Sequence, residues 1–156
     1  MKHTHRRYCT SRQRKNRRIL CAVGKACLNS SRRQNEKPTK YLLNFRCFST
    51  RTDSWIFRVF EACKAAPQHN YLFLTKNPQR YCELANAGKL PALDNFWYGS
   101  TVTKKEDRHF GGSIRYNTFI SIEPMLEPLD VGIGSFGGAR WIIVGAETGN
   151  RAGKVK

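Results

Sequence analysis

The sequence lacks the cysteine spacings of a local metal site. Its cysteines are spread over residues 9–82, and the two closest in sequence are six positions apart; they are Cys9, Cys21, Cys27, Cys47, Cys63 and Cys82. Zinc sites and iron–sulfur clusters are usually held by CxxC pairs or other closely spaced ligands. This pattern gives no local signature of a zinc site or an iron–sulfur cluster, and we predict no metal and no cofactor for this chain.

Long apolar runs are also missing. No stretch approaches the roughly 18–20 apolar residues of a membrane-spanning helix, and the start MKHTHRRYC lacks the apolar centre of a signal peptide. We therefore expect no membrane partner, a cytoplasmic location and reduced thiols. The stretches GAETG and GSFGG match no nucleotide-binding fingerprint, and the histidines form no constellation with a nucleophile. Catalytic residues thus stay unassigned.

Acidic residues are scarce in residues 1–52. This segment holds 15 of the 28 Lys and Arg residues but one of the 11 acidic residues, so it carries +14 of the total net charge of +17. Residues 53–156 hold 13 basic and 10 acidic residues, a net charge of +3. The change near Asp53 predicts two parts, a basic and poorly structured segment over 1–52 and a folded domain over 53–156.

Three interpretations of the basic segment remain open. It is a nucleic-acid-binding arm, a solvated tail, or an out-of-frame translation joined to a genuine coding segment. In the first case the phosphate contacts would come from basic side chains, and Tyr8, Tyr41 and Phe45 would be available for base stacking. These basic residues are Arg6, Arg7, Arg14, Lys15, Arg17 and Arg18.

From residue 53 onward, helical and strand patterns alternate. The spacing predicts a helix with Asp53 as its cap and a second helix with Asn77 as its cap, Pro78 at its first position and Gly88 at its end. Apolar runs of strand length predict strands at 70–75, 95–102, 117–122 and 140–146, and 40–45 is a further candidate. Such alternation is typical of an α/β fold, either a partial (β/α) TIM-type barrel or an open parallel sheet.

Polar residues follow each predicted strand. Because the carboxyl ends of parallel strands share one side, and ligands of α/β proteins bind there, these residues form a candidate ligand-binding rim. Lys76 would pair with a carboxylate or phosphate, and the glutamates would accept hydrogen bonds from an ammonium group or ribose hydroxyls, or act as a general base. The rim residues are Lys76, Ser100, Thr101, Ser121, Glu123, Gly145 and Glu147. The alternative explanation is structural: residues of these types are also common where a strand ends and the chain meets water.

Four stretches carry a resemblance to a known family. APQHNYLFLTKNPQRY, LPALDNFWYGSTVT, FISIEPMLEPLD and WIIVGAETG resemble successive motifs of a family of bacterial and phage proteins of unassigned function, described as radical-S-adenosylmethionine-like. The resemblance covers about residues 53–149. It implies a (β/α) barrel with Lys76, Glu123 and Glu147 at its top.

The resemblance also implies S-adenosylmethionine and a 4Fe–4S cluster, held by three closely spaced cysteines near the N-terminus. None of the six cysteines fits that motif, so none is assigned as a ligand. We therefore expect a truncated or frame-disrupted relative without cluster-dependent activity. The alternatives are a nucleic-acid-binding module that uses the basic arm and a small-molecule enzyme that uses Lys76 and the two glutamates.

Overall fold

A computed structural model describes residues 38, 40–44, 52–111, 114–125, 128–129 and 136–146. Within these residues the chain forms two helices and five strands. The helices are α2 (Asp53–Lys64) and α3 (Gln79–Asn86). The strands are β1 (Lys40–Asn44), β2 (Asn70–Thr75), β3 (Phe96–Thr101), β4 (Asn117–Ile122) and β5 (Trp141–Val144). Neither described helix has the length and apolarity needed to cross a membrane.

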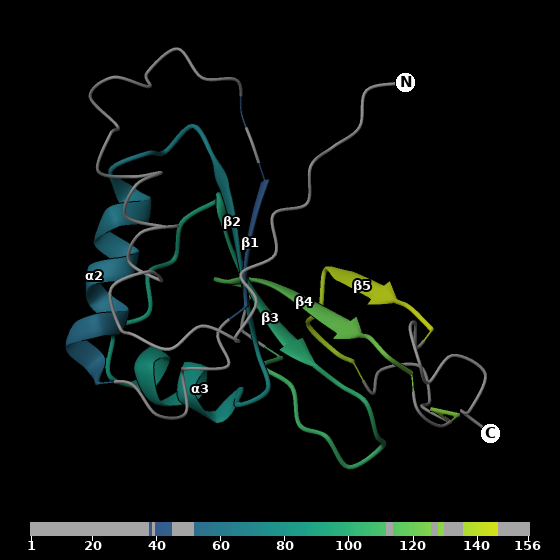
Figure 1. Ribbon diagram of the computed structural model, residues 1–156. Coiled ribbons are helices and arrows are strands. Elements are labelled where there is room, and N and C mark those ends of the chain that lie inside the picture. The colour runs from purple at the N-terminus through teal and green to yellow at the C-terminus, as the bar shows by residue number, and fades with distance from the viewer. Residues whose placement is uncertain are drawn as a thin grey trace, which may run out of the picture.

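The five strands form one parallel sheet in the order β1-β2-β3-β4-β5. The sheet curls into a half-barrel, and α2 and α3 cover its outer face (Figure 1). This confirms the predicted α/β class, and it confirms that 40–45 contains a strand. The strands predicted at 70–75 and 117–122 have the predicted bounds.

Strand β2 shows why these runs form a parallel sheet. Every residue from Tyr71 to Thr75 is buried, as expected for a strand covered on both faces. Successive side chains point to opposite faces, so Tyr71 and Phe73 pack beneath the helices, while Leu72 and Leu74 pack on the concave face with Phe119.

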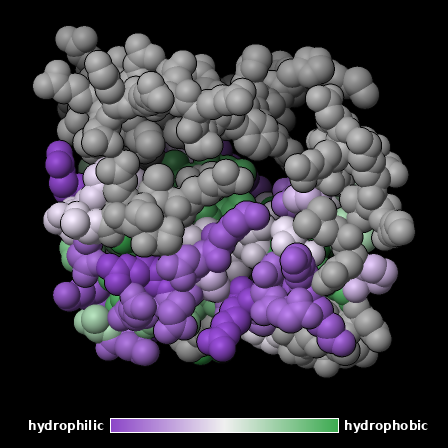
Figure 2. Space-filling view, turned by 60° about the horizontal axis from the view of Figure 1, so that its bottom comes forward, coloured by the Kyte–Doolittle hydropathy of each residue, from purple (hydrophilic) through white to green (hydrophobic). Residues whose placement is uncertain are grey.

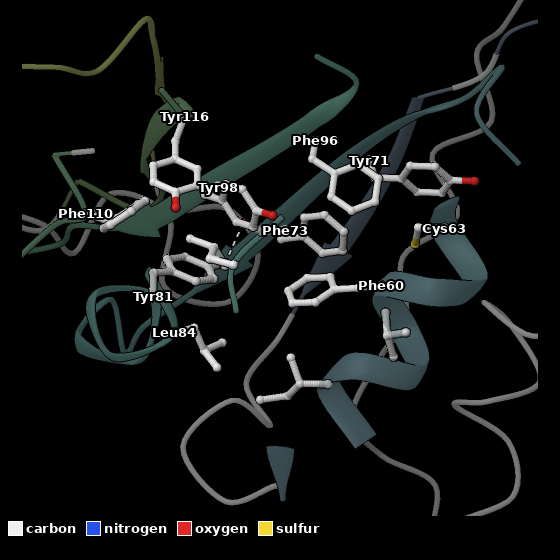
Figure 3. Packing of buried hydrophobic residues seen from close by; sticks show 13 residues of the cluster. Phe60, Cys63, Tyr71, Phe73, Tyr81, Leu84, Phe96, Tyr98, Phe110 and Tyr116 are labelled. Carbon is white, nitrogen blue, oxygen red and sulfur yellow. Dashed lines mark hydrogen bonds between the residues drawn. The ribbon is translucent and has the colours of Figure 1, made fainter. Parts of the chain in front are cut away.

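The layer between the helices and the sheet is built largely from aromatic side chains (Figure 3). Phe60 on α2 contacts the rings of Phe73, Phe96 and Tyr98, with centroids 5.4, 6.2 and 6.4 Å away. The buried tyrosines satisfy their hydroxyls locally, since Tyr81 donates to the Phe73 carbonyl at 2.9 Å. Burial raises the pKa of Tyr81 well above its ordinary value, so the hydroxyl stays protonated and keeps this hydrogen bond.

Both helices begin one residue away from their predicted starts. The cap of α2 is Thr52, and Asp53 is the first helical residue; its carboxylate lies in the first turn, where the helix dipole favours a negative charge. The cap of α3 is Pro78, while the backbone N–H of Asn77 donates to the Thr75 hydroxyl. The predicted end of α3 is confirmed, because Gly88 follows it with a φ of 68°.

The concave face carries a smaller apolar cluster, in which Leu72, Leu74 and Phe119 pack with Trp97 and Ile143. At the edge of the described sheet, β5 leaves Trp141, Ile142 and Val144 exposed to 42%, 44% and 60%. The continuous apolar sequence of β5 is typical of a strand covered on both faces. In the described sheet, however, β5 is an edge strand.

Candidate ligand-binding rim

The sheet register brings several predicted site residues together. Thr101 at the end of β3 pairs with Ser121 on β4, and Ser121 pairs with Ile143 on β5. Since Ile143 belongs to the concave-face cluster, Thr101 and Ser121 lie on that face too. Lys76 follows β2 in the same alternation as Leu72 and Leu74, and Glu123 and Gly145 continue the alternation of β4 and β5. Five predicted residues thus share one end of one face.

This end of the molecule is polar at its surface. Figure 2 brings the bottom of Figure 1 forward, where β2 and β3 end, and hydrophilic residues (purple) gather across the lower part of that view. The exposed residues at these strand ends include Lys76 and the charged residues 104–107 in the loop after β3. The carboxyl ends of these strands therefore carry charged groups at the surface.

The Glu123 carboxylate is closely packed although its side chain is exposed. The Ser121 hydroxyl, itself buried, lies 3.3 Å from Glu123 Oε2 and donates to it. The carboxylate also lies against the backbone of Gly145, since a Cβ placed on Gly145 would be 2.7 Å from Oε1. Two backbone hydrogen bonds join these segments: Gly145 N–H donates to Ile122 O and Met125 N–H donates to Gly145 O, both at 3.0 Å.

Asp107 is a rim residue that the sequence analysis did not single out. Its Oδ2 accepts hydrogen bonds from the Thr103 N–H at 2.7 Å, the Thr103 hydroxyl at 2.9 Å and the Lys104 N–H at 3.0 Å. Burial alone would raise its pKa, but these hydrogen bonds and the nearby Lys76 charge together lower the pKa below the ordinary value. A Thr four positions before an Asp, directly after a strand, is the pattern that would have indicated it.

Ser100 does not lie with the other predicted rim residues. It precedes Thr101 by one position and therefore points to the opposite, helix-facing side of the sheet. There it is fully buried, and its Oγ accepts a hydrogen bond from the Phe110 N–H at 2.9 Å. Its hydroxyl holds the loop after β3. Ser100 therefore lies on the helical side of the sheet, apart from the other predicted rim residues.

Comparison with known proteins assigns the chain to a family. The model of a family described as protein of unknown function (DUF5131) matches residues 3–156. The chain belongs to the DUF5131 family. The match spans the basic segment as well as the sheet, and a family of unassigned function is what the four motifs predicted. No curated protein and no solved structure matches the chain significantly.

Several predicted residues of this DUF5131 chain lie outside the described residues. They are Glu147 of the rim, the basic residues Arg6, Arg7, Arg14, Lys15, Arg17 and Arg18, and the cysteines Cys9, Cys21, Cys27 and Cys47. Their roles stay predictions.

The cysteines within the described ranges do not fit an iron–sulfur cluster. Cys63 is buried in the aromatic layer on α2, and Cys82 is half-buried on α3, so both belong to the helical side of the sheet. In the same ranges no three His, Cys, Asp or Glu side chains come together as a metal site. No reaction step through a cluster is therefore derived for this chain.

Proposed function

We propose that this DUF5131 protein binds a small polar molecule at the carboxyl-end rim of its half-barrel. The observation that carries the proposal is that Lys76, Thr101, Ser121, Glu123 and Gly145 share one end of the concave face, on four neighbouring strands. In parallel α/β sheets this is the end at which ligands bind.

The rim residues divide into two groups by charge. Lys76 binds an anionic group of the ligand, and its positive charge also contributes to lowering the pKa of Asp107. Glu123 accepts hydrogen bonds from a group that carries N–H or O–H donors, and the half-buried Thr101 lies in register with Ser121 beside it. Since neighbouring strands are roughly 4.8 Å apart, the ends of β2 and β4 are roughly 10 Å apart, a span that fits a small molecule with a charged group at each end.

The best candidate ligand class follows from the resemblance to radical-S-adenosylmethionine-like barrels. S-adenosylmethionine carries a carboxylate, a protonated amine and ribose hydroxyls, the groups that Lys76 and Glu123 are suited to bind. We further propose that the chain acts as a degenerate relative without cluster-dependent chemistry, because neither the cysteine spacing nor the described cysteines Cys63 and Cys82 suit a cluster.

Calorimetric titration with S-adenosylmethionine tests the ligand proposal. We expect Lys76→Met and Glu123→Gln each to weaken binding by about tenfold or more, the equivalent of about 1.4 kcal/mol. Lys64→Met and Glu61→Gln serve as matched controls, because they change an exposed ion pair on α2. Unchanged affinity in both rim variants, or the absence of binding by the unaltered protein, would count against the proposal.

Anaerobic reconstitution with iron and sulfide tests the second part. We expect no stoichiometric iron or sulfide and no thiolate-to-iron absorbance after desalting. A coloured protein that retains both elements in a cluster ratio would show that the chain does hold a cluster.

The alternative function is nucleic-acid binding by residues 1–52. It is favoured by the +14 net charge of that segment, which would give a strong, salt-dependent attraction to phosphates. The rim and the basic segment are separate in sequence, so the two proposals can be tested independently.

A further inference from the structure

We propose that Gly145 and Ser121 are positioning residues that hold the Glu123 carboxylate ready for a protonated amine of the ligand. The inference rests on the proposed function, because it names the chemical group that this part of the rim binds. It assigns separate roles to the backbone of Gly145, which follows β5, and to a hydroxyl of β4.

Because Gly145 has no side chain, it leaves the space that the Glu123 carboxylate occupies. A Cβ at this residue would lie 2.7 Å from Glu123 Oε1, 2.9 Å from its Cγ and 3.2 Å from its Cδ. The backbone cannot easily move away, since the Gly145 N–H donates to Ile122 O and the Gly145 carbonyl accepts from the Met125 N–H, both at 3.0 Å. An alanine here would therefore displace the flexible end of Glu123 rather than the strand.

Ser121 fixes the other carboxylate oxygen. Its side chain is 2% exposed, and an ionised carboxylate only accepts hydrogen bonds, so the hydroxyl donates to Oε2. One oxygen is thus bound by a buried hydroxyl, and the other lies against β5. Both keep lone pairs for a donor that arrives from the open side of the rim.

The charges of the rim select a cation as that donor. The Asp107 carboxylate already accepts three hydrogen bonds, and the charge of Lys76 contributes to lowering its pKa. Among the ion pairs between described residues, none involves Glu123. A protonated amine supplies a positive charge and N–H donors to the Glu123 carboxylate, and charge-assisted hydrogen bonds of this type are the strong ones.

The test follows the side-chain carboxyl carbon of Glu123 by NMR in protein labelled at glutamate Cδ, with the signal assigned by its loss in Glu123→Gln. The probes are methylammonium and tetramethylammonium, which carry the same charge but differ in N–H donors. We expect a saturable shift of the Glu123 signal with methylammonium and a much weaker response to tetramethylammonium. The signals of Glu61 and Glu83 on the helices serve as internal references.

Two sets of variants test the positioning. We expect Gly145→Ala and Ser121→Ala each to weaken the methylammonium response about fivefold or more, and Ser121→Thr, which keeps a hydroxyl, to restore it. Thermal melts confirm that each variant is folded; if Gly145→Ala is not, the Ser121 pair decides.

Three results would overturn the inference: an equal response to both probes, an unchanged response in Gly145→Ala, or equal loss in Ser121→Ala and Ser121→Thr. A positive methylammonium result with no binding of S-adenosylmethionine would reject the proposed ligand and leave the positioning intact. Binding of S-adenosylmethionine without a methylammonium effect would do the reverse.

Discussion

At the scale of single residues, Gly99 shows how closely the concave face is packed. A Cβ on this glycine would lie 2.2 Å from Cζ of the Phe119 ring and 2.5 Å from both of its Cε atoms. The ring of a neighbouring strand therefore occupies the space that any other residue would need. A glycine is required here because the Phe119 ring packs directly against its backbone, and not because of a turn.

We predict that Gly99→Ala lowers the free energy of unfolding by about 1–3 kcal/mol, because the added methyl group overpacks a buried site. Chemical denaturation measures the change. In a Phe119→Leu background the same substitution should cost less, since the ring that it meets is gone. An equal cost in both backgrounds would contradict this account.

At the scale of the element, the loop after β3 is organised by one carboxylate. Asp107 Oδ2 accepts hydrogen bonds from Thr103 and Lys104, and at the far end of the loop the Phe110 N–H is held by Ser100. The start of the loop is therefore held by Asp107, and its far end is anchored to Ser100 on the helical side of the sheet. The Lys76 charge, at the end of the neighbouring strand, contributes to lowering the pKa of Asp107.

The lowered pKa of Asp107 predicts a pH dependence of stability. A carboxyl group whose pKa is lower in the folded state stabilises the fold above the unfolded pKa of about 4, and this contribution is lost as the pH falls through the folded value. We expect Asp107→Asn to be less stable than the unaltered protein at pH 7. Denaturation curves at several pH values should show the difference shrinking below pH of about 4. A difference independent of pH would contradict the role of the charge.

At the scale of the whole molecule, the described residues form a half-barrel whose first strand, β1, lies within the strongly basic residues 1–52. The aromatic layer beneath α2 and α3 closes the outer face of β2 and β3, whereas β5 keeps Trp141, Ile142 and Val144 exposed to 42% or more. The two parts differ in charge by a wide margin, with +14 on residues 1–52 and +3 on residues 53–156. Any binding to nucleic acid should therefore depend on the first part.

The nucleic-acid alternative predicts a salt-dependent affinity that a set of substitutions removes. Fluorescence anisotropy with a labelled oligonucleotide should show log K falling linearly with log salt, with a slope reduced by up to about 0.7 for each lost contact with a single strand. Replacing Arg6, Arg7, Arg14, Lys15, Arg17 and Arg18 by Gln leaves β1 intact. An unchanged affinity and slope in this variant would exclude the arm as the binding surface.

Much of the fold could be predicted from the sequence, because its strands are unusually clear. Strands covered on both faces need continuous apolar runs, and NYLFLT and NTFISI form β2 and β4 with the predicted bounds. Both predicted helix starts differ from the observed ones by one residue. Thr and Asp both suit the start of α2, and Asn and Pro both suit the start of α3. Such choices depend on contacts such as the ion pair between Asp53 and Arg80.

The candidate rim could be predicted only in part. The structure brings Lys76, Thr101, Ser121, Glu123 and Gly145 to one end of one face, as expected for polar residues that follow parallel strands. Ser100 lies on the opposite face because neighbouring strand residues point in opposite directions. The sequence of the Ser100–Thr101 pair does not indicate which of the two faces the helices. Asp107 was missed because its hydrogen bonds depend on the path of a loop.

The sequence by itself determined the α/β class, the order of the strands along the chain and the carboxyl-end location of a polar rim, since each depends on local periodicity. Only the tertiary structure decided which hydroxyl lies on the concave face, how Glu123 lies across Gly145 and which hydrogen bonds Asp107 accepts. These features depend on strand register and on contacts between distant segments, which local patterns do not encode.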